Sequence, residues 1–591
     1  MEMEVSSRGD QTRHHTLTMR LFDFKGGVKP DYQKEASTQT PIAVSPTPTF
    51  LVIPLHQNIG GTPRPLVGAG DHVLKGQRIG AADVAAGGNI SGNMSSAIHA
   101  SSSGRVVAVE MRRMPHPSGL AAMCVVIETD GRDEWIARQP FDYRSHTAAE
   151  TRDYLRDAGI VGLGGAAFPT HMKTSPGKTG RLDTLVVNGA ECEPFITCDD
   201  LLMRERADAI LQGVAILRDL LAAERVLIGI EDNKPEAIAA MQAATRAHNS
   251  NDMQVIAVPT RYPAGGAKQL IRVLTGIEVP HGERSTDYGV QCFNVGTAYA
   301  VHEAINLGQP LISRIVTVAG NVTTPRNYEV LIGTSMKTLL AQSQCLPDTD
   351  RLIMGGPMMG VTLPDDDVPV VKATNCILAG SAKLFPPPLP EMPCIRCGEC
   401  AAACPADLQP FELYWFSRAK LFGKAQEYHL FDCIECGCCS YVCPSNIPLV
   451  DYYRFAKSEI WAHESEKAAA DQAREHYEFR QLREAREQQE KAARLAAKVA
   501  ASRAAVAAAA TAATAIAAPE KSTAENIPAP TTESATPAAL IAAALERARA
   551  QQTQPQNTTN LTPEQQAEIA AIEARRAQIR EQAHPHLPPD D

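Results

Sequence analysis

The stretches CIRCGECAAACP, residues 394–405, and CIECGCCSYVCP, residues 433–444, carry the strongest signal in this chain. Each run places four cysteines with two, two and three residues between them and ends in proline. Nine of the 15 cysteines fall between Cys394 and Cys443, so disulfide bonds and metal ligation are the two uses to weigh. One such run could arise by chance, but two identical runs so close together indicate metal ligation.

The spacing distinguishes between kinds of metal centre. Zinc favours CxxC pairs set further apart, whereas CxxCxxCxxxCP is the bacterial ferredoxin spacing for [4Fe–4S] clusters, whose fourth cysteine completes the other cluster. The sequence therefore predicts one cluster held by Cys394, Cys397, Cys400 and Cys443, and a second held by Cys404, Cys433, Cys436 and Cys439. Cys438 is displaced by one position and is predicted to be a non-ligand. Structural zinc and free buried thiols are the alternatives.

Composition limits the class of protein. A chain of 591 residues predicts two to four domains, and its net charge of −10 argues against nucleic-acid binding. No run of 18 strongly apolar residues is present, so we expect no transmembrane span. The polar N-terminus lacks the apolar segment of a secretion signal, and residues 1–20 are expected to be disordered. We therefore expect the chain in the cytosol or on the cytosolic face of a membrane.

A glycine-rich loop precedes the cysteines by more than two hundred residues. In GIVGLGGAAFPTHMK, residues 159–173, Gly162, Gly164 and Ala167 match a dinucleotide fingerprint, but Pro169 disfavours the long helix that this fingerprint requires. Exposed amides that cradle a flavin phosphate are the better interpretation, with Lys173 supplying positive charge.

Two short apolar strands follow this loop. One ends on Asn188, and the other precedes Asn294 and Thr297. Strands that end in polar residues beside a glycine-rich loop are where α/β folds bind ligands. We therefore expect these residues beside the loop.

Several motifs together resemble known families. GLGGAAFPT, NGAECEP and FNVGT are similar to the FMN- and NADH-binding subunit of respiratory complex I. Together with RYPAGGAKQLIRVLTG and MGGPMMG, their order resembles the C subunit of the Rnf (Rsx) ion-translocating electron transport complex, over about residues 20 to 460. This resemblance implies a non-covalent FMN site that comprises Gly162, Gly164, Gly165, Lys173, Asn188, Glu191, Asn294 and Thr297.

The chain departs from these relatives at two loop positions. Ala167 stands where the family usually has glycine, and Leu163 replaces the arginine of the complex I relatives. A flavin-free fold kept as a scaffold is the alternative for this region.

The resemblance also implies a multidomain α/β architecture. Its parts are a β barrel-sandwich hybrid (21–125), an α/β FMN- and NADH-binding domain (140–310), a soluble-ligand-binding β-grasp domain (311–375), a helical two-[4Fe–4S] module (384–455) and an Ala-rich helical and disordered tail (460–591). The barrel sandwich looks lipoyl-like, but residues 81–97, between its halves, contain no carrier lysine. A last helix is predicted from Thr562.

These features predict an oxidoreductase subunit. A hydride from NADH would pass to FMN, and single electrons would then cross two [4Fe–4S] clusters. By resemblance, the partners are membrane-embedded subunits that move ions and a ferredoxin- or flavodoxin-type carrier, and the chain lies peripherally on the cytoplasmic face of the bacterial inner membrane. The alternatives are an iron–sulfur scaffold with a vestigial flavin fold and a soluble iron–sulfur oxidoreductase without a membrane partner.

Overall fold

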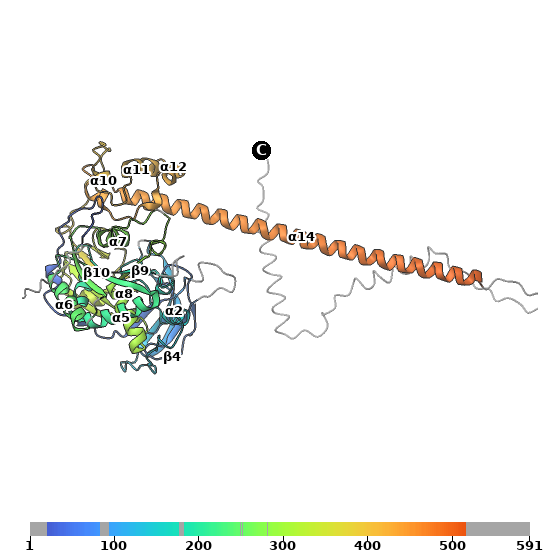
Figure 1. Cartoon of the computed structure of the whole chain (residues 1–591), viewed down its shortest axis with the longest axis horizontal. Coiled ribbons are helices and arrows are strands. Elements are labelled where there is room, and N and C mark those ends of the chain that lie inside the picture. The colour runs from blue at the N-terminus through green and yellow to red at the C-terminus, as the bar shows by residue number, and fades with distance from the viewer. Residues whose placement is uncertain are drawn as a thin grey trace, which may run out of the picture. The chain divides into compact units, whose positions relative to one another are not determined.

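A computed structural model describes residues 20–82, 94–116, 118–175, 182–248, 250, 252–280 and 282–515 of the chain. The contacts divide the chain into two units, Met1–Glu475 and His476–Asp591 (Figure 1). The first unit contains several small domains in the order that the sequence predicts. The expected N-terminal disorder, most of the segment between the barrel halves and the helix expected from Thr562 lie outside the described residues.

The N-terminal domain consists of two packed β-sheets. The strands are β2 (Phe50–Pro54), β3 (Arg64–Pro65), β4 (His72–Val73), β5 (Arg78–Ala81), β6 (Ile98–His99), β7 (Gly104–Arg113) and β8 (Ala121–Thr129). They form a four-stranded sheet, β2-β8-β7-β4, and a three-stranded sheet, β3-β5-β6. Alternation places Leu51 and Ile53 in the core while Phe50 is 50% exposed. Lys75 pairs with Asp133 at 2.5 Å and therefore has a structural partner.

The second domain is built on a parallel sheet. Its strands are β9 (Leu182–Gly189), β10 (Ala223–Glu231), β11 (Met253–Val258) and β12 (Val290–Asn294), in the order β11-β10-β9-β12. The helices are α2 (Ala148–Asp157), α3 (Thr170–Lys173), α4 (Cys198–Glu205), α5 (Ala207–Leu221), α6 (Pro235–Ala247), α7 (Ala267–Thr275) and α8 (Val295–Leu307), with the 3-10 turn η2 (Ser285–Tyr288) before β12.

Helices cover both faces of this sheet. Leu185 and Val187 of β9 share a buried cluster with α5, α6 and α8, whereas Val186 packs with α7 on the opposite face. A strand that is buried on both faces reads as a continuous apolar run, which is the pattern of this segment. The strand order reverses direction between β9 and β12, and ligands bind outside the carboxyl ends of strands at such a point.

The third domain is a mixed six-stranded sheet in the order β1-β14-β13-β17-β15-β16. Its strands are β1 (Ala43–Val44), β13 (Ser313–Gly320), β14 (Arg326–Leu331), β15 (Arg351–Met354), β16 (Val361–Leu363) and β17 (Cys376–Gly380), and helix α9 (Met336–Gln342) packs in the same core. The segment before β2, which lies within the range 21–125 expected for the barrel sandwich, contributes β1 and the turn η1 (Glu35–Ser37) to this domain.

The cysteine-rich module folds as a repeat. Its helices are α10 (Glu399–Ala402), α11 (Pro410–Arg418), α12 (Phe422–Glu427) and α13 (Cys438–Tyr441), with the turn η3 (Leu430–Asp432). The two runs adopt the same backbone. Gly398 and Gly437 have φ angles of +85° and +80°, and Arg396 and Glu435 both have a φ of +56°. The identical spacing of the two runs is therefore matched by closely similar local geometry.

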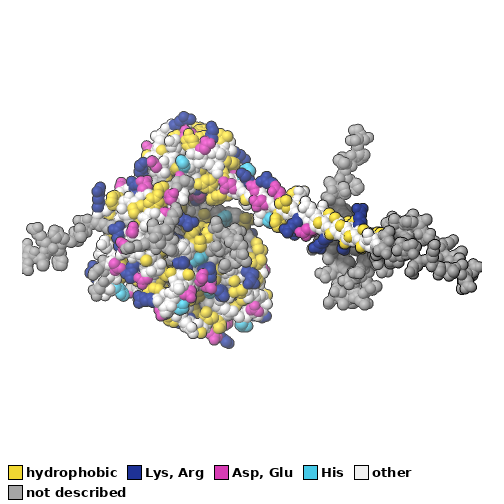
Figure 2. Space-filling view, turned by 45° about the vertical axis from the view of Figure 1, so that its right-hand side comes forward, with side chains coloured by type: hydrophobic (Ala, Val, Ile, Leu, Met, Phe, Trp, Pro, Cys, Tyr) yellow, Lys and Arg dark blue, Asp and Glu magenta, His cyan; other side chains and the backbone are white. Residues whose placement is uncertain are grey.

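Helix α14 (Leu449–Ala515) begins in the core of this module and continues beyond it. Three ion pairs between residues four apart in the range 480–490 stabilise its exposed part. No acidic residue follows between 491 and 515, and Figure 2 shows dark blue Lys and Arg side chains beside yellow apolar ones there. Across the described residues, every helix falls short of the length and apolarity that a membrane span needs.

Candidate flavin and iron–sulfur sites

The glycine-rich loop is fixed at both ends and open in the middle. Gly162 donates its amide to the Phe168 carbonyl at 2.7 Å, and Leu163 donates to Thr297 Oγ1 at 2.9 Å. Between these ties, residues 164–166 are exposed, and their N–H groups have no hydrogen-bond acceptor among the described residues. Gly165 has a φ of +104°, and a side chain there would meet only open space. Free amides beside open space suit a phosphate.

Asn188 and Asn294 lie at the carboxyl ends of neighbouring strands and are register partners. Asn294 caps α8, because its Oδ1 accepts the Gly296 amide at 2.9 Å, while its Nδ2 donates to Asp199 at 2.5 Å. Asn188 Nδ2 donates to the Gly265 carbonyl at 2.8 Å. The α8 N-terminus, which carries partial positive charge, therefore lies beside the glycine loop.

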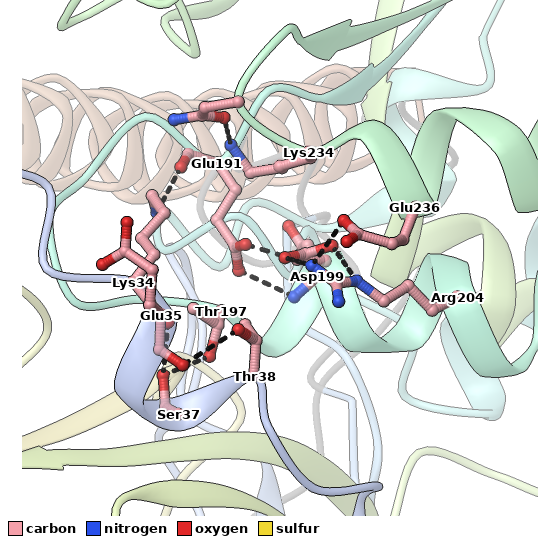
Figure 3. A network of polar contacts seen from close by, with 12 residues as sticks. Lys34, Glu35, Ser37, Thr38, Glu191, Thr197, Asp199, Arg204, Lys234 and Glu236 are labelled. Atoms are coloured by element: carbon pink, nitrogen blue, oxygen red, sulfur yellow. Dashed lines mark hydrogen bonds and ion pairs between the residues drawn. The ribbon is translucent and has the colours of Figure 1, made fainter.

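The glycine loop and the carboxyl ends of β9 and β12 are together called the crevice below. A buried polar network supports it from the β9 side (Figure 3). The Glu191 carboxylate caps α4 by accepting the amides of Asp199 at 2.7 Å and Asp200 at 3.2 Å. Lys34, which is 8% exposed, donates to the carbonyls of Glu191 at 2.8 Å and Glu193 at 2.9 Å. Burial raises the pKa of Glu191 to about 8 and lowers the pKa of Lys34. The network fixes the loop that follows Asn188.

Lys173 points to a different partner from the one that its sequence position suggests. Its ammonium donates to the Cys292 carbonyl and lies 4.7 Å from the centre of the Phe293 ring. Both partners belong to β12, immediately before Asn294. Burial lowers the Lys173 pKa. The Lys173 ammonium therefore lies against the end of β12.

The structure brings the eight predicted cluster ligands into two cavities. Cys404, Cys433, Cys436 and Cys439 line one cavity, together with Leu413, Val450 and Tyr453. Cys394, Cys397, Cys400 and Cys443 line the other, together with Phe411, Ile447 and Leu449. Each cavity thus combines three thiols of one run with the last thiol of the other, in apolar surroundings that suit an iron–sulfur cluster. All eight are free thiols, and Cys438 lines neither cavity.

Comparison with known families covers most of the first unit. The RnfC barrel sandwich hybrid domain matches residues 22–132, the Nuo51 FMN-binding domain matches 155–303, the SLBB domain matches 315–362 and the 4Fe-4S dicluster domain matches 393–447. The C subunit of the ion-translocating oxidoreductase complex of Yersinia pestis is 46% identical over 465 residues, which are 78% of this chain and 73% of that protein. The chain belongs to this family of C subunits.

Other members of the family are similarly close. The protein of Edwardsiella ictaluri is 48% identical over 70% of this chain, and that of Pseudomonas aeruginosa is 47% identical over 78%. This chain spans 50% and 58% of their lengths, respectively. A solved NAD+-reducing [NiFe]-hydrogenase chain aligns at 19% identity over 53% of this chain and 62% of that one, with a TM-score of 0.38.

These matches confirm the multidomain fold and the two cofactor classes predicted from the sequence. The chain contains an FMN-binding domain and a [4Fe–4S] dicluster domain. At the first departure from the family pattern, Ala167 has a φ of +47°, a conformation that glycine adopts more easily, and its methyl group is buried in the core. At the second departure, Leu163 is 5% exposed.

Sequence reasoning missed several residues that hold the crevice together. The Arg314 guanidinium donates to the carbonyls of Leu163 and Thr374, both at 3.1 Å, and so ties the glycine loop to the third domain. Glu193 accepts the amides of Met358 at 2.7 Å and Met359 at 3.0 Å from the MGGPMMG loop. Acceptors and donors so distant in sequence leave no local pattern. The one signal that could have found them is charge inside otherwise apolar segments.

Proposed function

We propose that this chain receives electrons at an FMN between β9 and β12 and passes them singly through two [4Fe–4S] clusters. The observation that carries this proposal is the direct connection between the flavin crevice and one cysteine cavity. Gly265 accepts the Asn188 amide and donates its own amide to Cys192 Sγ at 3.2 Å. Cys192 shares a buried cluster with Tyr262 and Cys436, and Cys436 lines that cavity.

On the flavin side, the chain provides binding and orientation. FMN, when bound, converts two-electron hydride chemistry into single-electron transfer, and NADH is the proposed hydride donor. The exposed amides of Gly164 and Gly165 would hold the phosphate, with added positive potential from Lys173 and the α8 N-terminus. Asn188 and Asn294 would orient the flavin from the strand ends. Gly162, Glu191 and Thr297 would act by fixing the loops around it.

On the cluster side, we propose the ligand sets that line the two cavities. The cluster of Cys404, Cys433, Cys436 and Cys439 would receive electrons first, because Cys436 packs against the flavin domain. The cluster of Cys394, Cys397, Cys400 and Cys443 would pass them on. Cys397 is exposed and its neighbour Ile395 is 69% exposed, so this end is accessible to a partner.

The family name supplies the wider setting of the proposal. We infer that the partners are the other, membrane-embedded subunits of an ion-translocating complex and a ferredoxin- or flavodoxin-type carrier. The chain would dock peripherally on the cytoplasmic face of the bacterial inner membrane. Electron flow through the clusters would then be coupled to ion movement in those partners.

One observation favours a second candidate, an iron–sulfur scaffold with a vestigial flavin fold. The side-chain amides of Asn188 and Asn294 and the Lys173 ammonium all have protein partners in the crevice. Binding FMN through these side chains would require some of these bonds to be exchanged. The backbone amides of residues 164–166 carry no such cost.

Anaerobic purification separates the candidates. Flavin and iron are counted in the same sample, and NADH is then added while flavin and cluster absorption are followed. The proposed function predicts bound FMN and NADH-dependent reduction of both clusters. If the protein contains both clusters but retains no flavin, even with excess FMN, the scaffold would be the remaining candidate. Purification from the membrane fraction together with other subunits distinguishes both from a soluble oxidoreductase.

A further inference from the structure

One buried tyrosine joins the flavin domain to a cysteine loop. Tyr262 lies after β11, is 1% exposed, and donates its hydroxyl to the Cys436 carbonyl at 2.7 Å. Its ring belongs to a small buried cluster with Val28, Cys192, Ala403, Cys436 and Cys438. The Glu193 carboxylate also lies beside this hydroxyl. A buried hydroxyl that donates to a backbone carbonyl contributes about 1 kcal/mol and fixes the position of that acceptor.

The N-terminal segment makes a second attachment beside the first. Val28 and Tyr262 exchange two backbone hydrogen bonds, at 2.8 and 3.0 Å. The preceding amide, that of Gly27, donates to the Ala403 carbonyl at 2.9 Å. Gly26 lies so close that an added Cβ would approach the Ala403 oxygen to 2.6 Å and the carbonyl carbon of Cys404 to 2.7 Å. The segment therefore needs glycine in order to reach the cysteine loop.

These two attachments converge on one cavity. Tyr262 holds the backbone of Cys436, and Gly27 holds the residue before Cys404. Cys404 and Cys436 come from different cysteine runs but line the same cavity. At the other cavity, by contrast, the Ser445 hydroxyl donates to Pro393 at 3.0 Å and the Met392 amide donates to Ser445 at 2.9 Å, and all three residues belong to the cluster module itself.

We propose that residues 26–28 and Tyr262 form a latch that positions the cluster of Cys404, Cys433, Cys436 and Cys439 against the flavin domain and sets its reduction potential. Tyr262 acts as a positioning residue, since it touches the ligand loop and not the reacting atoms. Its O–H dipole directs positive charge toward Cys436 and favours the reduced, more negative cluster. The inference rests on the proposed ligand sets, but it holds whether or not the crevice retains FMN.

The test compares two tyrosine-to-phenylalanine variants of the full chain with filled clusters. Tyr262→Phe removes the latch hydroxyl. Tyr414→Phe removes a hydroxyl from an equally buried tyrosine, 0% exposed, which bonds Glu391 at 2.8 Å inside the cluster module and lines neither cavity. Iron content, and the midpoint potential of each cluster from a chemical redox titration followed by electron paramagnetic resonance, are measured without NADH.

The latch predicts that Tyr262→Phe keeps its iron and lowers the potential of the cluster of Cys404 alone, while Tyr414→Phe leaves that potential at the wild-type value. Gly26→Ala should change the midpoint potential of the same cluster, because the added methyl group displaces the segment from Ala403. In flavin-loaded protein, both latch variants should weaken the magnetic interaction between a flavin radical and that cluster. Unchanged potentials in Tyr262→Phe, or equal shifts in both clusters, would overturn the latch. If wild-type protein contains no flavin, the proposed function is refuted. The measured potentials still decide whether the latch exists, because they do not depend on flavin.

Discussion

Asn188 and Asn294 lie opposite each other where the parallel strands β9 and β12 end, and their side chains hold different parts of the flavin crevice. Asn294 caps α8 and bonds Asp199, while Asn188 bonds the backbone of Gly265. Asn294 thus connects the sheet to the helix beneath the glycine loop. Asn188 connects the sheet to the segment that leads to Tyr262 and the cysteine cavity. In the proposed function, this pair would connect the flavin site to the path of the electrons.

Asn294→Ala should therefore affect both stability and flavin binding. Losing an N-cap costs about 1 kcal/mol of unfolding free energy, because the first amides of α8 lose their acceptor. Flavin content should fall as well, since the helix end borders the glycine loop. Chemical unfolding and flavin fluorescence measure the two effects. Asn306→Ala, near the C-terminal end of the same helix, is the control and should keep its flavin. Full flavin retention by Asn294→Ala would show that the cap is not part of the site.

Crossed ligation predicts which cysteine variants resemble each other. Cys404→Ser should lose the same cluster signal as Cys436→Ser, because both thiols line one cavity. Cys397→Ser should lose the other signal. Iron content and electron paramagnetic resonance spectra of the three variants provide the measurement. Cys438→Ser is the control and should retain all its iron, since Cys438 lines neither cavity. A Cys404→Ser spectrum that matches Cys397→Ser would mean that each run holds its own cluster.

The cysteine module could be predicted closely because its information is local. Spacing within each run sets which three thiols of that run lie together, and the backbone angles at Gly398 and Gly437 repeat accordingly. The glycine loop and the ends of β9 and β12 were predictable for the same reason. A short apolar strand that ends in a polar residue defines its own place in a parallel sheet.

The residues that join the domains could not be predicted in this way. Lys34, Tyr262 and Arg314 bond partners that are more than a hundred residues away, and their immediate neighbours carry no motif for that contact. The hydrogen-bond partner of Lys173 could not be predicted from the sequence either. The direction of the Lys173 side chain depends on how the short helix α3 packs against β12, which is set by tertiary structure.

Lys173→Ala should weaken flavin retention, and the loss of its charged hydrogen bond to the Cys292 carbonyl should cost about 1–3 kcal/mol at the end of β12. The ammonium contributes positive potential and also holds the end of β12 through the Cys292 carbonyl. NADH-driven reduction should fall with flavin content, whereas chemical reduction of the clusters should be unchanged. Gly165→Val should have a larger effect, because a branched residue is strained at a φ of +104° and fills the open space. Equal flavin content in wild type and both variants would place the phosphate elsewhere.

Ala167→Gly should leave flavin affinity unchanged. The methyl group of Ala167 is 6% exposed and lies in the core beneath the loop. Glycine relieves about 1 kcal/mol of left-handed strain but loses a buried methyl group worth about 0.8 kcal/mol. The free energy of unfolding should therefore change little. Flavin titration of the apoprotein tests the affinity, and tighter binding by the glycine variant would show that the methyl group narrows the site.

Lys372 predicts a pH dependence of stability at the junction of three domains. Its ammonium is 1% exposed and donates to the carbonyls of Ala97 at 3.0 Å and Gly159 at 2.7 Å. Burial lowers its pKa to about 7, whereas the unfolded chain keeps the ordinary value of 10.5. Between these two values the unfolded state binds more protons, so stability should rise with pH by up to ~1.4 kcal/mol per pH unit and level off below pH 7.

The Lys372→Met variant isolates this contribution, because methionine fills a similar volume and does not titrate. Urea unfolding of both proteins at pH 6.5, 7.5 and 8.5 gives the difference between them at each pH. The free energy of unfolding of wild type, relative to that of the variant, should increase from pH 7.5 to pH 8.5. Lys337→Met, on the exposed side of α9, provides the matched control and should follow wild type at every pH. A difference between wild type and Lys372→Met that stays constant from pH 6.5 to 8.5 would show that Lys372 remains charged in the folded protein.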